Sequence, residues 1–124
     1  FNVVAGILER NGKVLIGNRP FNGLLGGMWE FPGGKIETGE DHATALIREL
    51  TEELDVVVEL KEAFGIYQHS YTHFSVTVYP YFVKIADGKP TAKVAEMIDW
   101  VNIKELKNYP MGKVDRRISN NLMK

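Results

Sequence analysis

The sequence predicts an α/β fold in which a mixed β-sheet lies between two helices. Stretches rich in Val, Tyr, Phe and Thr, which favour β-strands, lie on both sides of one helical pattern. A second helical pattern closes the chain, and turn-forming residues separate the stretches. The length of 124 residues suits one domain with a substantial core, so we expect residues 1–124 to form a single domain.

The first predicted elements form a β-hairpin. Residues 1–8 and 13–17 are predicted strands. The turn between them, Arg10-Asn11-Gly12, contains the Asn-Gly pair that favours tight hairpins. A predicted loop over residues 19–27 follows and leads into the central part of the chain.

A helix is predicted over residues 40–54, after a glycine-containing segment. Gly33, Gly34 and Gly39 predict a loop, because glycine disfavours a helix interior. At about 100° per residue, one stripe of the helix is apolar and should pack on the core. Its members are Ala43, Leu46, Ile47, Leu50 and Leu54.

The second half of the chain predicts further strands and a closing helix. The predicted elements are strands at 56–60 and 98–101, a long hairpin of 64–70 with 74–85 that turns near 71–73, a turn at 87–90, a helical turn at 103–106 and a helix at 113–123. In the closing helix, Val114, Ile118 and Leu122 recur every four residues, which indicates one buried face.

The composition excludes several classes of protein. With 44% hydrophobic and 25% charged residues the chain is typical of globular proteins, and its net charge of −1 gives no general attraction to DNA or to a membrane. The absence of cysteine excludes disulfides and thiolate metal sites and suits the cytoplasm, where we expect the protein to act. No apolar run approaches the length of about 18 residues that predicts a membrane span, and no leader pattern is present. A start at Phe1 rather than Met is consistent with a trimmed chain or a piece of a longer protein.

Three carboxylates lie together on a second face of the predicted helix. Glu49, Glu52 and Glu53 repel one another there, which destabilises the helix unless a cation compensates. Hard divalent ions such as Mg²⁺ are bound through carboxylate oxygens, often together with substrate phosphates. Arg48 stands four residues before Glu52, within pairing reach. The alternative is an acidic face that is merely solvated.

The spacing around these acids is specific. Gly34, five residues, Glu40, seven residues and then Arg48-Glu49-Leu50-Thr51-Glu52-Glu53 resembles the Nudix box over 23 positions, residues 34–56. The departure is Asp55, where the family has glycine; a left-handed residue is wanted after the helix, and Asp is a tolerable second choice. The resemblance implies an α/β/α sandwich with a mixed sheet. It also implies hydrolysis of nucleoside diphosphates linked to another moiety, with Mg²⁺ or Mn²⁺ as cofactor.

The resemblance also implies residue roles. The expected metal-binding positions are the Gly34 carbonyl, Glu49, Glu52 and Glu53. Glu53 or Glu49 is expected to act as general base, and Arg48 to orient a glutamate. Glu96, in a loop that enters a strand, is either solvated or a second candidate base.

The expected substrate-binding residues are less specific. Arg19 is either a surface cation or a phosphate contact; proteins of this family often place a basic residue there, near the nucleotide. Trp29 and Tyr71 either belong to the core or flank a base. Lys113 and Asp115, which replace the expected base-reading asparagine, either bind a base edge or lie on the surface. His69 and His73 are four residues apart, but without cysteine they are better interpreted as structural histidines than as a zinc site.

Two branches of the family compete. Residues 26–40 resemble MutT-like enzymes of the 8-oxo-dGTP diphosphatase type, whereas residues 23–32 and 69–73 also resemble the C-terminal domain of MutY-type adenine glycosylases, which reads 8-oxoguanine in DNA. The complete set of box glutamates favours an enzyme. We therefore expect hydrolysis of nucleoside triphosphates, oxidised purine nucleotides such as 8-oxo-dGTP among them, to monophosphate and pyrophosphate. DNA is a partner only under the alternative, and the sequence predicts no oligomeric state.

Overall fold

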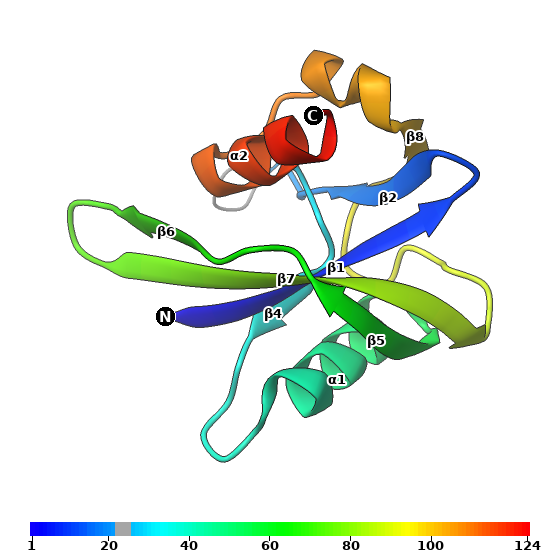
Figure 1. The fold of residues 1–124 in the computed structure, drawn as a ribbon, viewed down its shortest axis with the longest axis horizontal. Coiled ribbons are helices and arrows are strands. Elements are labelled where there is room, and N and C mark those ends of the chain that lie inside the picture. Colours follow the sequence, from blue (N-terminus) through cyan, green and yellow to red (C-terminus); the bar gives the residue numbers. More distant parts are fainter. Residues whose placement is uncertain (22–25) are drawn as a thin grey trace.

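A mixed β-sheet separates two helices. The computed structural model describes residues 1–21 and 26–124, so Gly23 to Leu25 of the loop motif lie outside the described residues. Helix α1 (His42–Leu54) packs on one face of the sheet and helix α2 (Lys113–Leu122) on the other (Figure 1). The predicted α/β/α sandwich is confirmed.

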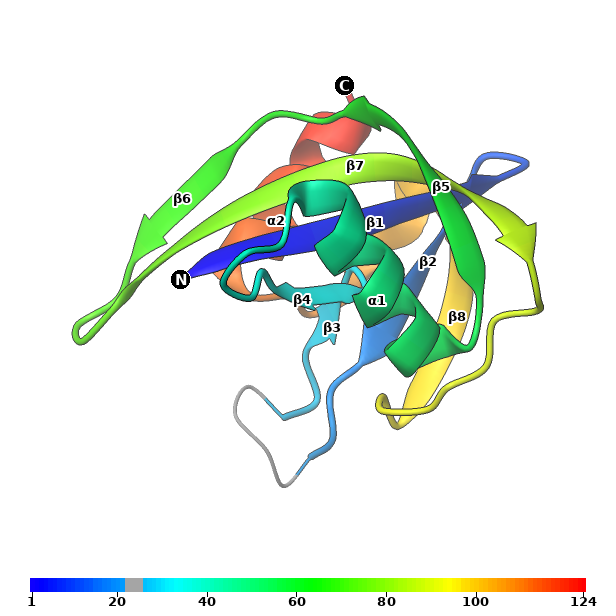
Figure 2. The ribbon, with the colours of Figure 1, turned by 90° about the horizontal axis from the view of Figure 1, so that it is seen from below.

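The six predicted strands appear in the predicted order, and β3 and β4 are added in segments where no strand was predicted. Within residues 1–21 and 26–124 the strands are β1 (Asn2–Arg10), β2 (Lys13–Asn18), β3 (Trp29–Glu30), β4 (Gly33–Lys35), β5 (Val57–Ala63), β6 (Tyr67–Ser70), β7 (Ser75–Asp87) and β8 (Met97–Asn102), with a 3-10 helix η1 (Ile103–Asn108) before α2. The sheet is mixed because β1 pairs in parallel with β7 but antiparallel with β2 and β4. Figure 2 shows β1 running through the middle of the molecule, between α1 and α2.

Both predicted hairpins are present. Asn11 and Gly12 have positive φ angles of 53° and 77°, as a tight β1–β2 turn requires. Ser70 pairs with Ser75, which leaves the predicted turn between β6 and β7.

Helix α1 begins two residues later than predicted, at His42 rather than Glu40. Asp41 is its N-cap, and the Asp41 carboxylate accepts a hydrogen bond from the Thr44 N–H at 2.8 Å. At the other end, Asp55 adopts the left-handed conformation (φ 57°, ψ 44°) and its N–H donates to the Thr51 carbonyl. The substitution of Asp for Gly therefore preserves the end of the helix.

The buried face of α1 is rotated relative to the predicted stripe. Leu46, Leu50 and Leu54 are buried as expected, but Ala43 and Ile47 are exposed and Ala45 is buried instead. Periodicity alone could not fix the orientation, because these stripes are neighbours on the helix. The rotation brings the side of the helix that carries Glu49 and Glu53 towards the sheet.

The segment around Gly33 and Gly34 forms strand β4, where a loop was predicted. Gly33 pairs with Ala5 and Gly34 with Val4 of β1. A Cβ atom on Gly33 would overlap the Val4 carbonyl oxygen. Glycine is thus required here by the close approach of two backbones rather than by a turn.

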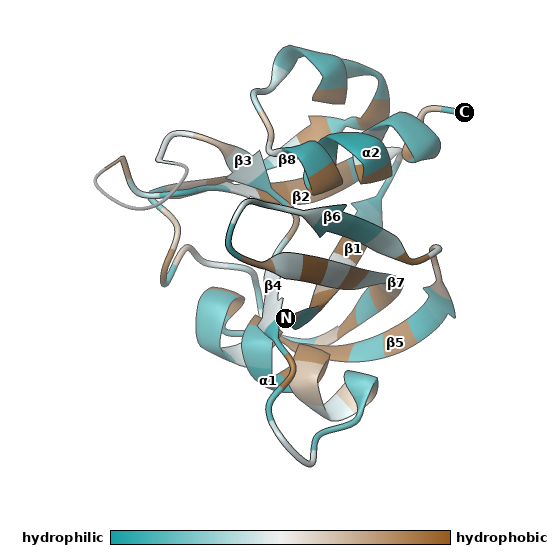
Figure 3. Cartoon of the chain, turned by 90° about the vertical axis from the view of Figure 1, so that its left-hand side faces the viewer, coloured by the Kyte–Doolittle hydropathy of each residue, from teal (hydrophilic) through white to brown (hydrophobic). Residues whose placement is uncertain are grey.

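Each face of the sheet carries its own core. Ile7, Ile16, Phe31, Leu106 and Ile118 belong to the cluster under α2. Figure 3 shows hydrophobic and hydrophilic residues alternating along α2, as expected for a helix with one buried face. The second cluster joins the leucines of α1 to the opposite face. Within the described residues, no helix is both long enough and apolar enough to cross a membrane.

We predict that Gly33→Ala destabilises the protein by about 2 kcal/mol or more, because the new methyl group must displace backbone in strand pairing. The matched control is Gly39→Ala. Gly39 has a φ of 87°, but a Cβ there meets no atom within 4 Å. Gly39→Ala should therefore lower the free energy of unfolding by only about 1 kcal/mol, because of conformational strain. Urea unfolding of both variants measures the difference. Equal losses would contradict the role given to the β1–β4 contact.

Candidate active site

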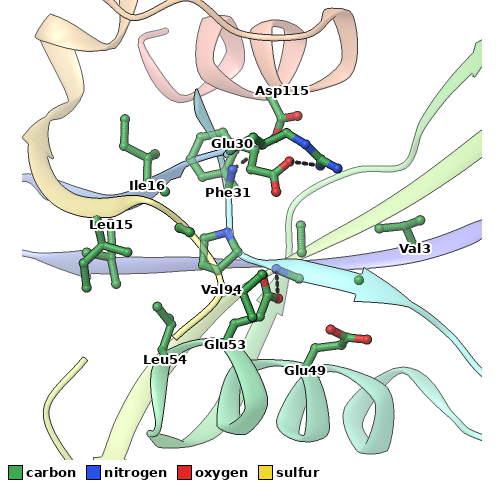
Figure 4. Close-up of a pocket in the computed structure, with 18 of the residues that line it drawn as sticks. Val3, Leu15, Ile16, Glu30, Phe31, Glu49, Glu53, Leu54, Val94 and Asp115 are labelled. Atoms are coloured by element: carbon green, nitrogen blue, oxygen red, sulfur yellow. Dashed lines mark hydrogen bonds and ion pairs between the residues drawn. The ribbon is translucent and has the colours of Figure 1, made fainter. Parts of the chain in front are cut away.

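A pocket of about 470 Å³ opens between α1, the N-terminal half of β1 and the start of α2. Five acidic residues line it from three elements: Glu30 from β3, Glu49, Glu52 and Glu53 from α1, and Asp115 from α2. Figure 4 shows Glu30, Glu49, Glu53 and Asp115 facing the same space. Apolar side chains of both cores form much of the rest of its wall. The pocket therefore concentrates negative charge in a largely apolar setting.

Glu53 lies in the last turn of α1. Its Oε2 accepts a hydrogen bond from the Gly33 N–H at 3.1 Å, which fixes the carboxylate against β4. Burial, together with the negative charges of Glu49 and Glu30, raises the pKa of Glu53 to about 8. Without a cation in the pocket, Glu53 is therefore a protonated or partly protonated acid near neutral pH.

Glu49 lies one turn earlier on the same side of α1. Its side chain is only 16% exposed and is paired with Arg48 Nη1 at 2.9 Å. A Cβ atom on Gly34 would collide with the Glu49 carboxylate, so the carboxylate keeps its present position only beside a glycine. Burial raises the pKa of Glu49, although the Arg48 charge acts in the opposite direction.

Arg48 joins several acids at the edge of the pocket. Its guanidinium binds both oxygens of Glu40, at 2.8 and 2.9 Å, and donates to the Lys35 carbonyl at 3.0 Å as well as to Glu49. Glu52 lies 3.6 Å from Arg48 but is 58% exposed. The hydrogen bond from Arg48 lowers the pKa of Glu40. Arg48 thus holds Glu40 through a bidentate interaction and Glu49 through a single hydrogen bond.

The donor set on this side of the pocket suits a hard divalent cation. Glu49, Glu52 and Glu53 offer carboxylate oxygens, and the backbone at Gly34 comes close because the residue has no side chain. Across residues 1–21 and 26–124, no three His, Cys, Asp or Glu side chains stand close enough to form a complete metal cluster by themselves.

A second group of charges lies on the α2 side. Arg19 Nη1 pairs with Glu30 Oε2 at 2.6 Å. The carboxylate of Asp115 accepts a hydrogen bond from the Phe31 N–H at 3.1 Å, and burial and the neighbouring Glu30 raise the pKa of Asp115 to about 7. Sequence reasoning missed Glu30. The one available signal was the position of Glu30 between Trp29 and Phe31, shortly before Gly33 and Gly34.

Trp29 and Tyr71, the aromatic residues predicted to belong to the core or to flank a base, lie outside the lining of this pocket. Trp29 packs edge-on against Tyr109, with ring centres 5.2 Å apart. Tyr71 stacks on Phe74 at 4.8 Å near the tip of the β6–β7 hairpin, and the His69 ring meets Tyr71 edge-on at 4.5 Å. A contact of Trp29 or Tyr71 with a base stays a prediction.

Two predicted charged residues also lie outside that lining. Lys113 is exposed at the first position of α2. Glu96 is exposed, and its N–H donates to the Asn18 carbonyl at 2.9 Å. Their roles as base-reading residue and second general base stay predictions.

Comparisons with known proteins agree with this geometry. A family model described as a NUDIX domain matches residues 3–121. The chain is 34% identical to the CTP pyrophosphohydrolase of Escherichia coli (strain K12), over 91% of this chain and 84% of that protein. It is 35% identical to the putative 8-oxo-dGTP diphosphatase 2 of Mycobacterium tuberculosis, over 92% of this chain and 82% of that protein.

Solved structures give the same result. The solution structure of the E. coli ORF135 protein superposes with a TM-score of 0.86 at 31% identity, over 98% of this chain and 87% of that one. The MutT NUDIX hydrolase from Burkholderia pseudomallei shares the fold, with a TM-score of 0.82 at 22% identity over 96% and 95% of the two chains. Since the family model spans nearly the whole sequence and two relatives exceed 30% identity over most of it, the chain belongs to the Nudix family of hydrolases.

Proposed function

We propose that this Nudix hydrolase requires Mg²⁺ and cleaves nucleoside triphosphates to monophosphate and pyrophosphate. The observation that carries the proposal is the pair of buried carboxylates, Glu49 and Glu53, in the same pocket as the Arg19–Glu30 pair and Asp115. One end of the pocket suits metal and phosphates, and the other offers polar groups for a base. We propose further that residues 1–124 act as one catalytic domain on the nucleotide pool of the cytoplasm.

Glu49, Glu53, Glu52 and the Gly34 carbonyl would hold the cation. Bound there, Mg²⁺, or Mn²⁺ in its place, would polarise the phosphate oxygens and neutralise charge on the leaving group. Arg48 keeps the Glu49 carboxylate in place through its hydrogen bond at 2.9 Å. Glu52 is the most exposed of the three glutamates, so its contribution should be the smallest.

Glu53 is the group best suited to accept the proton of the attacking water. The Gly33 N–H orients it. In the metal-free pocket, burial raises the pKa of Glu53 above that of an ordinary glutamate, and a bound cation would lower it towards neutrality. Glu49 is the second candidate, and Glu96 remains a third, on the loop beside the pocket.

The base would lie at the α2 end of the pocket. Arg19 and Asp115 line this end, and we keep Trp29, Tyr71 and Lys113 as residues that could flank the nucleotide. The diphosphatase relative supports an oxidised purine nucleotide such as 8-oxo-dGTP as substrate. The CTP pyrophosphohydrolase relative makes a pyrimidine triphosphate the second candidate.

The alternative, a DNA-reading domain of a MutY-type glycosylase, is not supported. Both of the sequence relatives described above are named as nucleotide hydrolases, and the chain covers more than four-fifths of each. The net charge of −1 also gives no electrostatic basis for binding a DNA backbone.

A substrate screen tests the proposal. We expect Mg²⁺-dependent phosphate release, in the presence of a pyrophosphatase, from 8-oxo-dGTP or CTP among a panel of nucleotides. Glu53→Gln keeps the shape but removes the charge, so turnover should fall at least a hundredfold while the fold survives. Glu59→Gln, an exposed glutamate on β5, is the matched control and should keep wild-type turnover. Normal turnover by Glu53→Gln would show that the site is wrong.

The bond that breaks can be located with ¹⁸O-labelled water. Attack at the β-phosphorus, the habit of MutT-like enzymes, would place the label in pyrophosphate and leave the nucleoside monophosphate unlabelled. Mass spectrometry of both products distinguishes the alternatives. Label in the monophosphate would contradict attack at the β-phosphorus without affecting the metal site.

The raised pKa of Glu53 predicts an unusual pH dependence of stability for the metal-free protein. Between about pH 4.5 and 8, the folded state keeps a proton that the unfolded state has released, so the free energy of unfolding falls as pH rises. Asp115, with a pKa of about 7, adds to the same trend. Glu53→Gln removes the contribution of Glu53, so the free energy of unfolding of the variant relative to wild type should increase as the pH rises through this window.

The expected gain at pH 8.5 is on the order of 2 kcal/mol, since one pKa unit corresponds to about 1.4 kcal/mol and water at the pocket mouth screens part of the shift. Urea unfolding in EDTA at pH 5, 6.5 and 8.5 measures it. A difference between wild type and variant that stays constant with pH would mean that Glu53 ionises as an ordinary surface acid.

A further inference from the structure

The C-terminal end of α1 is capped by a distant part of the chain. The last carbonyls of any helix have no partner within the helix. In α1, the Glu53 carbonyl accepts from the Lys93 N–H at 3.1 Å and the Leu54 carbonyl from the Thr91 N–H at 2.9 Å. The donors belong to the connection between β7 and β8, which Figure 2 shows passing the end of α1 before it enters β8.

The same connection is fixed at its other end to the opposite wall of the pocket. The Glu96 N–H donates to the Asn18 carbonyl at 2.9 Å, at the end of β2. The next residue, Arg19, lines the pocket and pairs with Glu30. Between the two anchors, Val94 and Ala95 line the pocket themselves. Residues 91–96 therefore form a bridge from α1 to β2 across one side of the pocket.

The bridge restrains Glu53, the residue proposed as general base. Glu53 is the penultimate residue of α1, in the turn where helices fray. Its carboxylate is held by the Gly33 N–H and its carbonyl by the Lys93 N–H. Two independent hydrogen bonds, one to the side chain and one to the backbone, thus restrain Glu53. Loss of the backbone bond would release the last turn and let the carboxylate move away from Glu49.

We propose that residues 91–96 are a positioning element for Glu53, and that Thr91 and Lys93 are its positioning residues through their backbone N–H groups. The inference rests on the proposed function, in which Glu53 serves the chemical step. It differs from the expectation for Glu96, because it assigns the contribution of this loop to its backbone rather than to an acidic side chain. A group that only orients a catalytic carboxylate should affect kcat rather than substrate binding.

Proline at position 93 removes the N–H that bonds to Glu53. We expect Lys93→Pro to lower kcat at least tenfold while KM changes less than about threefold. Lys93→Ala keeps the N–H and should therefore keep the wild-type kcat. Ala92→Pro is the matched control, since it stiffens the same segment without removing either of the two capping hydrogen bonds. Thr91→Pro, which removes the bond to Leu54, is the second test variant and should show the same separation of kcat from KM.

A rise in KM with unchanged kcat would overturn the proposal, because it would make the segment a substrate contact. So would equal losses in Lys93→Pro and Ala92→Pro, since any stiffening would then account for the effect. Loss of kcat in Lys93→Ala would assign the effect to the lysine side chain and would overturn it too.

Hydrogen exchange in the metal-free protein tests the bridge without any turnover. Thr91 and Lys93 are exposed residues, yet their amides should exchange slowly in the wild type. In Lys93→Pro, the amides of residues 52–55 should exchange at least tenfold faster while those of β1 and β7 stay unchanged. Rapid exchange of the Thr91 and Lys93 amides in the wild type would overturn the bridge. Absence of turnover with slow exchange would instead refute the proposed function and leave the bridge intact.

Discussion

The structure is organised around the burial of negative charge at the C-terminal end of helix α1. The C-terminal end of a helix carries partial negative charge and favours cations. The last turn of α1 contains Glu52 and Glu53 and no basic residue. Glu53 is also taken out of water and placed near Glu49 and Glu30, which raises its pKa. Local electrostatics alone would not retain this arrangement, so the rest of the fold must impose it.

The fold imposes it through backbone contacts that side chains would prevent. Gly33 lets β4 lie against β1, and this places the Gly33 N–H on the Glu53 carboxylate. Gly34 leaves the space that the Glu49 carboxylate occupies. Arg48 compensates the acids on one side only, through Glu40 and Glu49. The uncompensated charge is thereby directed towards the interior of the pocket, where a divalent cation would have the greatest effect.

The sequence was most informative where structure depends on local rules. The Asn11-Gly12 turn, the left-handed Asp55 and the hairpin of β6 and β7 follow from the conformational preferences of a few neighbouring residues. The positions of the box glutamates on α1 follow from helical spacing. These features need no knowledge of distant contacts, and the resemblance to the Nudix box added the chemistry.

The features that the sequence could not predict depend on contacts between distant segments. Gly33 and Gly34 indicate a loop by propensity, and only the pairing with β1 makes them a strand. Ala45 lies on the side of α1 that carries Glu49 and Glu53, so the apolar pattern does not place it inside, and only packing on the sheet buries it in place of Ile47. Glu30 enters the pocket because β3 pairs with β2 beside Arg19. Such pairings are set by the whole chain.

The distribution of charge also constrains how a substrate could bind. Five carboxylates line the pocket, whereas Arg48 is already engaged by Glu40 and Glu49 and Arg19 pairs with Glu30. A bare triphosphate would meet net repulsion at short range, where the low dielectric of a largely apolar wall strengthens it. The pocket is therefore complementary to a triphosphate only when a divalent cation neutralises the acids of α1. On this argument metal and nucleotide bind with positive coupling, and the pKa of Glu53 falls as they bind, which would leave its carboxylate ionised for chemistry at neutral pH.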